Sequence, residues 1–528
     1  MKTTRRKFIG TVGAGTAALL VGCNKAKKIP GSILGASAAA GHRLRMGGFP
    51  APSEMVETGV VIIGGGIAGL AAARRLDQLG HRDFTLIELE QQPGGNAASG
   101  RNNVSAYPWG AHYVPLANEE SVEVLGWFEE LGVIRGRDAN GAPVYNEEFL
   151  CADPMERLFD AGRWQEGLLP QIGITQDDRR QYREFFARME EFRSLRGSDD
   201  RPAFAIPLDL SSRDSALLAL DRKTMSDWMT EQGWNSTPLR WHVDYSCRDD
   251  YGAGIAQVSA WAGVHYFASR RGRAANADRD AVVTWPEGNG WLVQKLAEPC
   301  APKTRSGCVV YQVEQNDAGI LVDYLDVARE RSIRVKARGA ICAAPRFVAH
   351  RMIRDLPAAN GGVYSPWMVA NVTLDRLPQG AGAALAWDNV ARASDSLGYV
   401  VATHQNVALV PRETVITHYW PLDAAAPAEE RERALARSHS DWCDRVVADL
   451  DRIHPGIRSH IQNIDIWIWG HGMIRPVPGF IWGDARQAMQ LPHGRIIFAH
   501  SDMSGISIFE EAFTRGTQAA DALVKLIA

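Results

Sequence analysis

The chain has 528 residues, of which 45% are hydrophobic and 23% charged, so it can bury a large core and is long enough for several domains. This composition excludes a disordered, collagen-like or disulfide-scaffold protein. Lys and Arg total 58 against 61 for Asp and Glu, and the resulting net charge of −3 excludes the strongly basic surface that a nucleic-acid partner would need.

The first residues have the pattern of an export signal. Arg5 and Arg6 precede Phe8-Ile9 and a short stretch rich in Gly and Ala, which is typical of a twin-arginine signal. That stretch is too short to span a membrane. Leu20-Val21-Gly22-Cys23 resembles a bacterial lipobox, in which the cysteine is lipidated after cleavage, although a chance cysteine behind a secretory signal gives the same pattern. We expect residues 1–22 to be removed and Cys23 to anchor the protein on the periplasmic side of a bacterial membrane.

Residues 23–57 are rich in Gly, Ala, Ser and Pro and show neither helical nor strand periodicity. They are predicted to form a lipidated, flexible tether. Because the twin-arginine route carries proteins that are already folded, often with a bound cofactor, the signal also suggests a cofactor that is inserted in the cytoplasm.

A dinucleotide-binding unit is predicted to begin at residue 58. The β-branched run Val60–Ile63 has the composition of a buried parallel strand, and the residues after Gly69 favour a helix. Between them, Gly64, Gly66 and Gly69 form the spacing G-x-G-x-x-G, in which the glycines permit a tight turn, close approach of a pyrophosphate and close packing of helix on strand. Ala68, in the first helical turn, belongs to the same predicted phosphate-binding segment.

A second predicted strand, Phe84–Ile87, ends at Glu88, which lies 19 residues after Gly69. An acidic side chain at this place can accept hydrogen bonds from the hydroxyls of an unphosphorylated ribose. A solvated glutamate at a strand end is the alternative interpretation. Gly94 and Gly95 follow in the next loop.

From this point the chain resembles the FAD-dependent superfamily that contains monoamine oxidases, polyamine oxidases, protoporphyrinogen oxidase and phytoene desaturases. These proteins share the strand–glycine–helix unit, the ribose glutamate and the Gly-Gly pair. In them the pair is usually followed by arginine, whereas Asn96 follows here. The resemblance implies FAD as the cofactor, and it leaves the electrostatic support of the pyrophosphate uncertain at Asn96.

Later segments extend the resemblance over the whole mature chain. Residues 309–324 alternate as a β-hairpin, in which Val310 would cover the adenine. A strand from Gly494 ends in Asp502, the acid that in this family bonds the ribityl or phosphate region, and a helix is predicted from Phe509 to Ile527. No cysteine lies in this last region, so FAD is expected to bind noncovalently.

The resemblance implies an α/β protein, in which a Rossmann-like FAD-binding domain of the two-dinucleotide-binding-domain type is interleaved with an α+β substrate domain. The expected FAD-binding segments are residues 58–150, 284–346 and 471–528. The expected substrate-domain segments are residues 151–283 and 347–470.

The family's catalytic pattern is incomplete in this sequence. Amine oxidases of the group place a lysine near the reactive flavin nitrogen, but the matching segment, residues 365–374, contains none and offers Ala370 or Asn371. The aromatic residue expected before the last helix falls near Ile508. The seven cysteines form no CxxC pair, so no metal site is expected.

Two histidines are the candidates for proton transfer. His112 lies in Trp109–Tyr113, which matches the family segment that passes over the flavin, and a structural histidine bonded to backbone is its alternative. His404 is the weaker candidate; its strand-like segment, residues 400–405, is expected to pair with residues 415–420.

We therefore expect an FAD-dependent oxidoreductase that removes hydride from a small organic molecule, by C–N or C–C oxidation, in the cell envelope, with oxygen or a quinone as the open choice of electron acceptor. The missing lysine leaves a non-catalytic flavin-binding or assembly lipoprotein as an alternative. A desaturase or isomerase acting on an isoprenoid is another, because a membrane anchor suits a lipid substrate. The 16 tryptophans suggest that the substrate pocket is aromatic.

Overall fold

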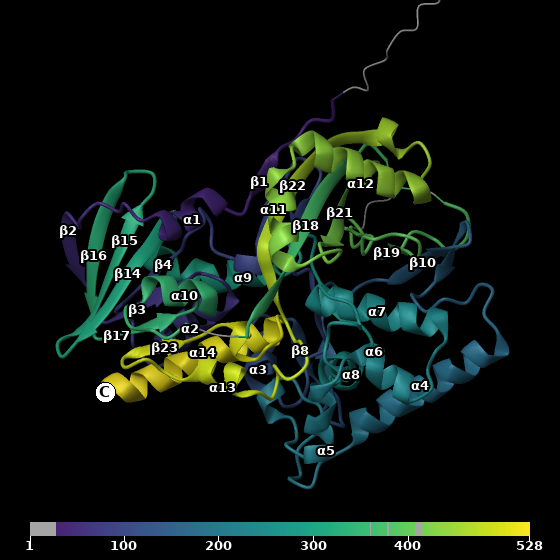
Figure 1. The fold of residues 1–528 in the computed structure, drawn as a ribbon, viewed down its shortest axis with the longest axis horizontal. Helices are drawn as coiled ribbons and strands as arrows, with labels where there is room; N and C mark the ends of the chain where they lie inside the picture. The colour runs from purple at the N-terminus through teal and green to yellow at the C-terminus, as the bar shows by residue number, and fades with distance from the viewer. Residues whose placement is uncertain (1–27, 359–360, 377, 379, 407–412) are drawn as a thin grey trace, which may run out of the picture.

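The computed structural model describes residues 28–528, except residues 359–360, 377, 379 and 407–412. The predicted twin-arginine signal and Cys23 lie outside the described residues. The rest of the chain forms two lobes that lie side by side (Figure 1). In the part that the structure describes, no helix is both long enough and apolar enough to cross a membrane.

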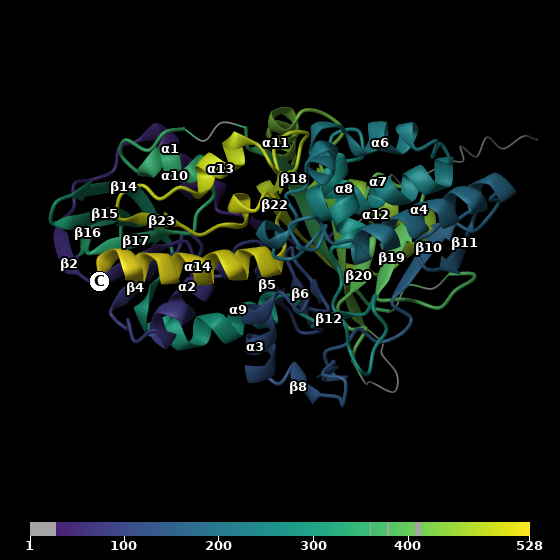
Figure 2. The same cartoon turned by 90° about the horizontal axis from the view of Figure 1, so that it is seen from below.

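The core of the first lobe is a parallel sheet whose central strand contains only Val and Ile. Val60 and Ile62 of this strand pack on helices, and Val61 and Ile63 pack on a second sheet, so both faces are buried. The five strands, in spatial order, are β13 (Thr304–Arg305), β4 (Phe84–Ile87), β3 (Val60–Ile63), β17 (Gly339–Cys342) and β23 (Ile496–Phe498). The helices on one face, seen below the sheet in Figure 2, are α2 (Ile67–Gln78), α14 (Phe509–Ile527), α3 (Val122–Glu130) and α9 (Gly290–Ala297).

The other face of this sheet is covered by a smaller sheet, in which three strands are antiparallel and the fourth pairs parallel. The predicted hairpin is confirmed, because its strands pair antiparallel from Cys308 opposite Asp326 to Asn316 opposite Gly319. The strands of this sheet are β14 (Cys308–Asn316), β15 (Gly319–Asp326), β16 (Arg331–Ala337) and β2 (Glu54–Glu57).

The second lobe is built on a mixed sheet of eight strands. The predicted pairing of residues 400–405 with 415–420 is confirmed in part, since Tyr399 and Val401 lie opposite His418 and Ile416. In spatial order the strands are β1 (Ile33–Gly35), β22 (Ile461–Arg475), β18 (Val363–Leu374), β21 (Thr414–Pro421), β20 (Tyr399–Val401), β19 (Asp388–Ala391), β10 (Glu156–Asp160) and β11 (Arg163–Glu166).

Helices cover this sheet differently on its two sides. The apolar residues of α12 pack on one face, with Trp442 and Leu450 in the shared core. A separate helical core lies on the opposite side of the sheet from α12, below the sheet in Figure 1. These helices are α11 (Pro427–Ala436), α12 (His439–Ile453), α4 (Gln176–Ser194), α5 (Ser215–Leu218), α6 (Met225–Glu231), α7 (Thr237–Tyr251) and α8 (Ala260–Ala268).

Short elements connect the lobes. Three two-stranded ribbons and two short helices complete the described fold, and of these the strand Tyr113–Pro115 and the helix Arg346–Met352 contribute residues to the cavities described below. They are β5 (Ser99–Arg101) with β6 (Ala106–Pro108), β7 (Tyr113–Pro115) with β12 (Val282–Thr284), β8 (Ile134–Arg137) with β9 (Pro143–Tyr145), α10 (Arg346–Met352) and α13 (Asp484–Gln490).

The chain passes repeatedly between the lobes, as the predicted interleaved α/β fold requires. The parallel sheet of the first lobe takes strands from three separated parts of the sequence. One boundary differs from the prediction: β22 runs without a break to Arg475, through the expected division between residues 470 and 471. Its register against β18 extends from Ile461 to Arg475, so the end of this strand belongs to the second lobe's sheet.

Residues 28–57, which were predicted to be a flexible tether, are instead part of the fold. Strand β1 pairs with β22, helix α1 (Ala38–Met46) follows, and β2 pairs with β16. The segment therefore crosses from the second lobe to the first. Its local pattern lacks periodicity because the order comes from pairing with sheet edges far away in the sequence, which single-sequence periodicity cannot show.

Candidate functional site

A long cavity opens at the carboxyl end of β3, and the predicted cofactor residues gather around it. It encloses about 2080 Å³ including its open mouth. In a parallel α/β sheet this end of the strands is where ligands bind. The predicted residues that line it are Gly64, Gly66, Ala68, Glu88, Gly94, Gly95 and Val310.

The glycines leave space for a ligand and allow close packing. A methyl group added at Gly66 would meet only the Cα atom of Gly95, at 3.8 Å, so it would project into the cavity. At Gly69 the same methyl group would lie 1.9 Å from the carbonyl oxygen of Gly64, so glycine is needed there for the helix to pack closely on the turn. Gly69 does not line the cavity. Gly95 has a φ of +54°, which favours glycine.

Helix α2 presents an uncapped N-terminus to this cavity. Its N-cap is Gly66, no side chain bonds its first turn, and that turn contains no acidic residue. The N–H groups and the positive end of the helix dipole are thus available to an anion such as a pyrophosphate.

Glu88, which directly follows strand β4, lies in the wall of the same cavity and is 7% exposed. One of its carboxylate oxygens accepts the N–H of Gly65 at 2.5 Å, and the other accepts the N–H of Glu90 at 2.8 Å. Burial raises the pKa of Glu88. The two backbone bonds hold the carboxylate in the wall, where it can also accept the hydroxyls of a ribose.

Asp502 is placed beside this cavity and not in its wall. Its carboxylate accepts the hydroxyl of Tyr364 at 2.6 Å and the N–H of Arg346 at 3.2 Å, and it lies 3.0 Å from Nδ1 of His500. The wall itself is formed by His500 and Ser501. The strand was therefore located from the sequence, but the side chain that faces the cavity is one residue earlier than the predicted acid.

A second cavity of about 990 Å³ adjoins the first on the side of the second lobe. The two cavities share Asn96, Ala111, Asn289, Trp469, Ser507, Ile508 and Phe509. Aromatic rings from both lobes line the second cavity, as the tryptophan content suggested. These rings belong to Tyr113, Trp367, Tyr419, Trp469 and Phe509.

Four charged side chains lie in the wall of this aromatic cavity, and the sequence analysis missed them. Arg270 donates to Asp250 at 2.8 Å and to the hydroxyl of Tyr113 at 3.3 Å. Burial and, secondly, the neighbouring Asp250 raise the pKa of Asp249 to about 7. Burial also raises the pKa of Glu510 to about 7, and its Oε2 atom has no hydrogen-bond partner among the described residues. Three carboxyl groups thus face one guanidinium.

His112 stands in the same wall, stacked on Tyr419 with ring centres 4.6 Å apart. Its Nδ1 lies 3.3 Å from the carbonyl oxygen of Gly110, so in the neutral ring Nδ1–H donates there and Nε2 is left as an acceptor. Burial lowers the pKa of His112 to about 4. His112 therefore both hydrogen-bonds to the backbone and lines the cavity.

The other predicted histidine, His404, lines neither cavity. Its Nε2 lies 2.7 Å from the carbonyl oxygen of Ala152, in a partly exposed turn after β20. On the strand where a lysine was sought, Asn371 is fully engaged, since it donates to Pro108 and accepts from Thr417. No lysine lines either cavity among the described residues.

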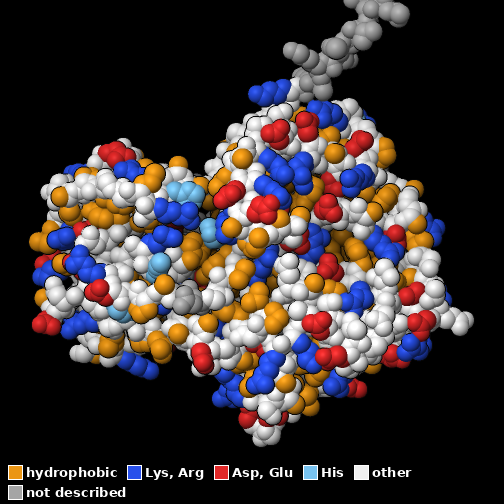
Figure 3. All heavy atoms as spheres, in the orientation of Figure 1, with side chains coloured by type: hydrophobic (Ala, Val, Ile, Leu, Met, Phe, Trp, Pro, Cys, Tyr) orange, Lys and Arg blue, Asp and Glu red, His pale blue; other side chains and the backbone are white. Residues whose placement is uncertain are grey.

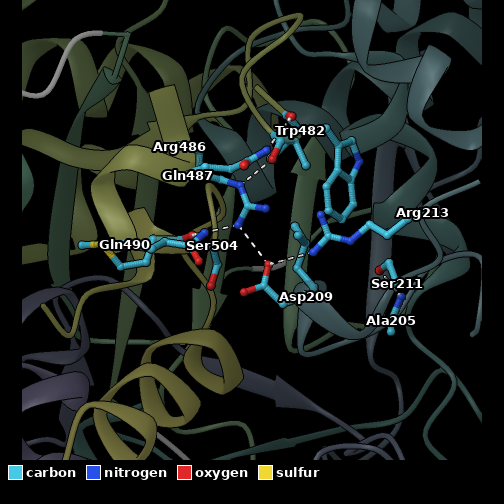
Figure 4. Close-up of polar contacts among 12 residues, drawn as sticks. Ala205, Asp209, Ser211, Arg213, Trp482, Arg486, Gln487, Gln490 and Ser504 are labelled. Carbon is cyan, nitrogen blue, oxygen red and sulfur yellow. Dashed lines mark hydrogen bonds and ion pairs between the residues drawn. The ribbon is translucent and has the colours of Figure 1, made fainter. Parts of the chain in front are cut away.

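A buried ion network holds the wall that the two cavities share. Arg486, 1% exposed, donates to Asp209 at 3.2 Å and to the carbonyl oxygen of Met503 at 2.8 Å. Arg515 donates to the other oxygen of Asp209 at 2.5 Å. Figure 4 shows Asp209 between the guanidinium groups of Arg486 and Arg213. Asp209 belongs to the second lobe, whereas Arg486 and Arg515 belong to the first. The network therefore fixes the segment leading to Phe509 relative to the second lobe.

Comparisons with known proteins agree with this geometry. Residues 62–131 match the family described as an NAD(P)-binding Rossmann-like domain. Solved structures align over nearly the whole described chain. The fold is similar to that of putrescine oxidase and cyclohexylamine oxidase. No curated protein matches the sequence.

Three of the similar structures illustrate the likeness. A double mutant of putrescine oxidase is 15% identical with a TM-score of 0.65, and the alignment covers 89% of this chain and 100% of that one. Cyclohexylamine oxidase from Brevibacterium oxydans is 16% identical with a TM-score of 0.62, over 89% and 99% of the chains. A fatty acid isomerase from P. acnes is 15% identical with a TM-score of 0.58, over 89% and 99%. At such identities the likeness shows the fold alone.

The first cavity fits FAD on its own geometry. The space that a Cβ at Gly66 would fill, the uncapped helix and the buried carboxylate of Glu88 match the needs of a pyrophosphate and a ribose. The cavity shares Phe509 and its neighbours with the aromatic cavity, so a ligand that fills the first cavity would border the second.

Proposed function

We propose that the protein is an FAD-dependent oxidoreductase that oxidises a small organic amine at its C–N bond. The observation that carries this proposal is the junction of the two cavities: a dinucleotide site ends against an aromatic chamber that contains an unpaired buried carboxylate oxygen on Glu510. An unpaired carboxylate of this kind is costly unless a cation or a donor meets it.

The charge of the chamber supports an amine over a neutral or anionic substrate. Asp249, Asp250 and Glu510 face Arg270, and Arg270 is already bonded to Asp250. An ammonium group would satisfy the remaining carboxylates, and the aromatic walls would hold its apolar part and attract its charge. A carboxylate substrate would be repelled by the same groups.

Four residues near the junction of the two cavities have a proposed part in the reaction. FAD, when bound, accepts the hydride from the substrate carbon. Nε2 of His112 accepts the proton that the substrate nitrogen loses, because Nδ1–H is held by Gly110. Glu510 binds and orients the amine, while Tyr419 and Trp469 exclude water and position its carbon. We propose noncovalent attachment of FAD, and oxygen or a quinone as the oxidant that restores it.

We further propose that the protein acts in the cell envelope. The support is the sequence Arg5-Arg6 before an apolar stretch and the lipobox-like segment ending in Cys23. Export in the folded state and lipid anchoring on the periplasmic side follow from this proposal. Replacement of both arginines by lysine is expected to leave the protein in the cytoplasm, as measured by fractionation and immunoblotting.

A spectroscopic experiment tests the proposed activity. The purified full-length protein is expected to show oxidised-flavin absorbance, which primary amines bleach under anaerobic conditions. Alcohols and carboxylic acids of matched carbon skeleton serve as controls and should leave the spectrum unchanged. A protein that contains no flavin would contradict the proposal, and so would a flavin that no amine reduces.

The alternatives make different predictions in the same experiment. The absence of a lysine from both cavity walls favours the non-catalytic flavin-binding protein, for which no substrate would bleach the flavin although photoreduction would. An isoprenoid desaturase fits the chamber less well, because three carboxyl groups and a guanidinium would have to be buried against a hydrocarbon.

A further inference from the structure

Helix α1, which precedes the predicted dinucleotide-binding unit in the chain, forms part of the wall of the first cavity, where FAD is proposed to bind. Five of its residues enter the wall together with Gly64 and Gly66: Ala38, Gly41, His42, Leu44 and Arg45. Figure 3 shows histidine and basic side chains gathered at the junction of the lobes, near α1 and α11. The side chains concerned, here called the cationic face, are His42, Arg45, Arg351, Arg431 and His471.

The cationic face has no acidic partners of its own. Among the described residues no carboxylate lies within ion-pair distance of Arg45, Arg351 or Arg431, although arginines elsewhere in the protein are often paired. Within the described ranges, Arg431 donates only to the carbonyl oxygens of Tyr364 and Gly470, at 3.3 and 3.4 Å.

The acids of the cavity wall are otherwise engaged. They are Glu88, held by backbone N–H groups, and Glu90, held by Ser37. Burial, with Arg431 and Arg45 as the next causes, lowers the pKa of His471 to about 4, so this ring is neutral near pH 7 and the positive charge of the cationic face comes from its arginines. Like charges gathered without counter-charges favour an anionic ligand.

Helix α1 is fixed in place by contacts at both ends. At its start, Ser37 donates to Glu90 through its N–H at 2.8 Å and its hydroxyl at 2.6 Å. Beyond its end, Phe49 stacks on Tyr311 with ring centres 4.3 Å apart. Arg43, on the helix itself, pairs with Glu330 at 2.8 Å. Arg45 is thereby held toward the cavity, while Arg43 is turned to a partner outside it.

We infer that the cationic face, to which helix α1 contributes His42 and Arg45, is a binding subsite for the pyrophosphate of FAD. This inference rests on the proposed function. In oxidised FAD the pyrophosphate carries the negative charge, so it is the part of the ligand that the unpaired guanidinium groups in this cavity would meet. The helix dipole of α2 binds it from the first lobe, and the arginines add charge where Asn96 supplies none.

The experiment measures the rate at which FAD leaves the holoprotein, by the rise of flavin fluorescence after dilution, at low and high salt. Arg45→Gln and Arg431→Gln are each expected to speed release about tenfold at low salt, a change on the order of 1.4 kcal/mol. The double variant should lose most of the salt dependence that the unaltered protein shows. Arg45→Lys, which keeps the charge, should restore most of the slow release.

Arg43→Gln is the matched control, because it removes a guanidinium from the same helix without touching the cavity. It should release FAD at the unaltered rate. Equal acceleration by Arg43→Gln and Arg45→Gln would overturn the inference, since the effect would then come from loosening α1. Unaltered release from Arg45→Gln and Arg431→Gln would overturn it too.

A comparison of ADP with adenosine tests whether the arginines bind the phosphates or the adenosine part of the ligand. ADP is expected to compete with FAD for the apoprotein and to lose affinity in Arg45→Gln, whereas adenosine should be unaffected by the substitution. An equal loss for both ligands would overturn the inference. Tight FAD binding without any amine oxidation would overturn the proposed function and leave this inference standing. A full-length protein that binds no FAD would overturn both.

Discussion

Glu510 is the side chain whose burial is hardest to explain without a ligand. It lies in the first turn of α14, is 2% exposed and has an unpartnered Oε2 atom. Burial raises its pKa from an ordinary 4.5 to about 7, so above pH 7 the folded protein holds a charge that costs free energy. Such a cost is tolerated at sites where a ligand compensates for it.

Glu510→Gln is therefore expected to have opposite effects on stability and on binding. The free energy of unfolding should rise by a few kcal/mol at pH 8, because the burial of the charge is relieved, and should be unchanged below pH 4.5, where the carboxyl is protonated in both states. KM for an amine should rise about tenfold or more. Thermal denaturation across pH and steady-state kinetics give the two readouts. A KM that stays constant would exclude Glu510 from substrate binding.

His112→Asn is expected to lower kcat about 100-fold while FAD stays bound, because the substitution removes the Nε2 acceptor near the substrate. Since burial lowers the pKa of His112 to about 4, the unaltered enzyme should lose kcat only as the pH falls through about 4, where the ring becomes protonated. In the variant this limb of the pH profile should be absent. His404→Asn, at a position outside both cavities, is the control. Equal kcat in His112→Asn and the unaltered enzyme would assign His112 a purely structural role.

At this scale the sequence indicated some residues and missed others for a physical reason. Gly66 and Glu88 follow from local spacing and Val310 from the family resemblance, and all three lie in the wall of the first cavity. Asp249 and Arg270 sit in charged runs that look like ordinary solvated helix ends, and only tertiary packing brings them into the aromatic cavity. The acidic first turn of α14, the first long helix after β23, was the signal that could have revealed Glu510.

At the scale of elements, the turn between β3 and α2 contains glycines with two different roles: one leaves space for a ligand, and the other allows close packing. Gly66→Ala should fold with unaltered stability, since φ is −72° and the nearest atom to the new methyl group is 3.8 Å away, yet it should weaken FAD binding at least tenfold by filling the pyrophosphate space. Gly69→Ala should destabilise the whole protein, because its methyl group would lie 1.9 Å from a backbone oxygen. Thermal denaturation of the apoproteins, with FAD titration by fluorescence quenching, distinguishes the two. Unaltered FAD affinity in Gly66→Ala would place the pyrophosphate elsewhere.

Elements with strong local patterns were predictable, whereas elements ordered by distant partners were not. Strand Phe84–Ile87 and helix Phe509–Ile527 have the predicted bounds, because a buried strand and an amphipathic helix show their period in the sequence. Helix α1 and strand β1 have no such pattern. They are ordered by Glu90 and by β22, which lie far along the chain.

The contact of α13 with the second lobe gives a further prediction. Arg486→Met should lower the free energy of unfolding by about 3 kcal/mol, because it leaves Asp209 in a partly buried place with one interior partner fewer. Arg213→Met is the control, since Arg213 is 45% exposed and lies 4.0 Å from the same carboxylate. Its effect should stay within about 0.5 kcal/mol. Denaturant unfolding measures both, and equal effects would show that burial does not distinguish the two pairs.

For the whole molecule, the cavities are walled by segments from both lobes and from the N-terminal strap of residues 28–57. A ligand in these cavities would contact parts that the chain brings together only in the complete fold. A ligand that binds such a site stabilises the entire structure, by an amount that grows with the logarithm of its concentration.

FAD is accordingly expected to raise the Tm of the apoprotein by several degrees in one cooperative step, and the rise should increase with FAD concentration. Riboflavin, which lacks the pyrophosphate and the adenosine that Glu88 and the α2 N-terminus would bind, should give a much smaller rise. Acid precipitation of the holoprotein should leave the flavin in solution, because noncovalent attachment does not survive unfolding. Flavin that remains with the precipitate would contradict noncovalent binding. Two separate thermal transitions, only one of which responds to FAD, would show that the lobes unfold independently and that the cofactor does not join them.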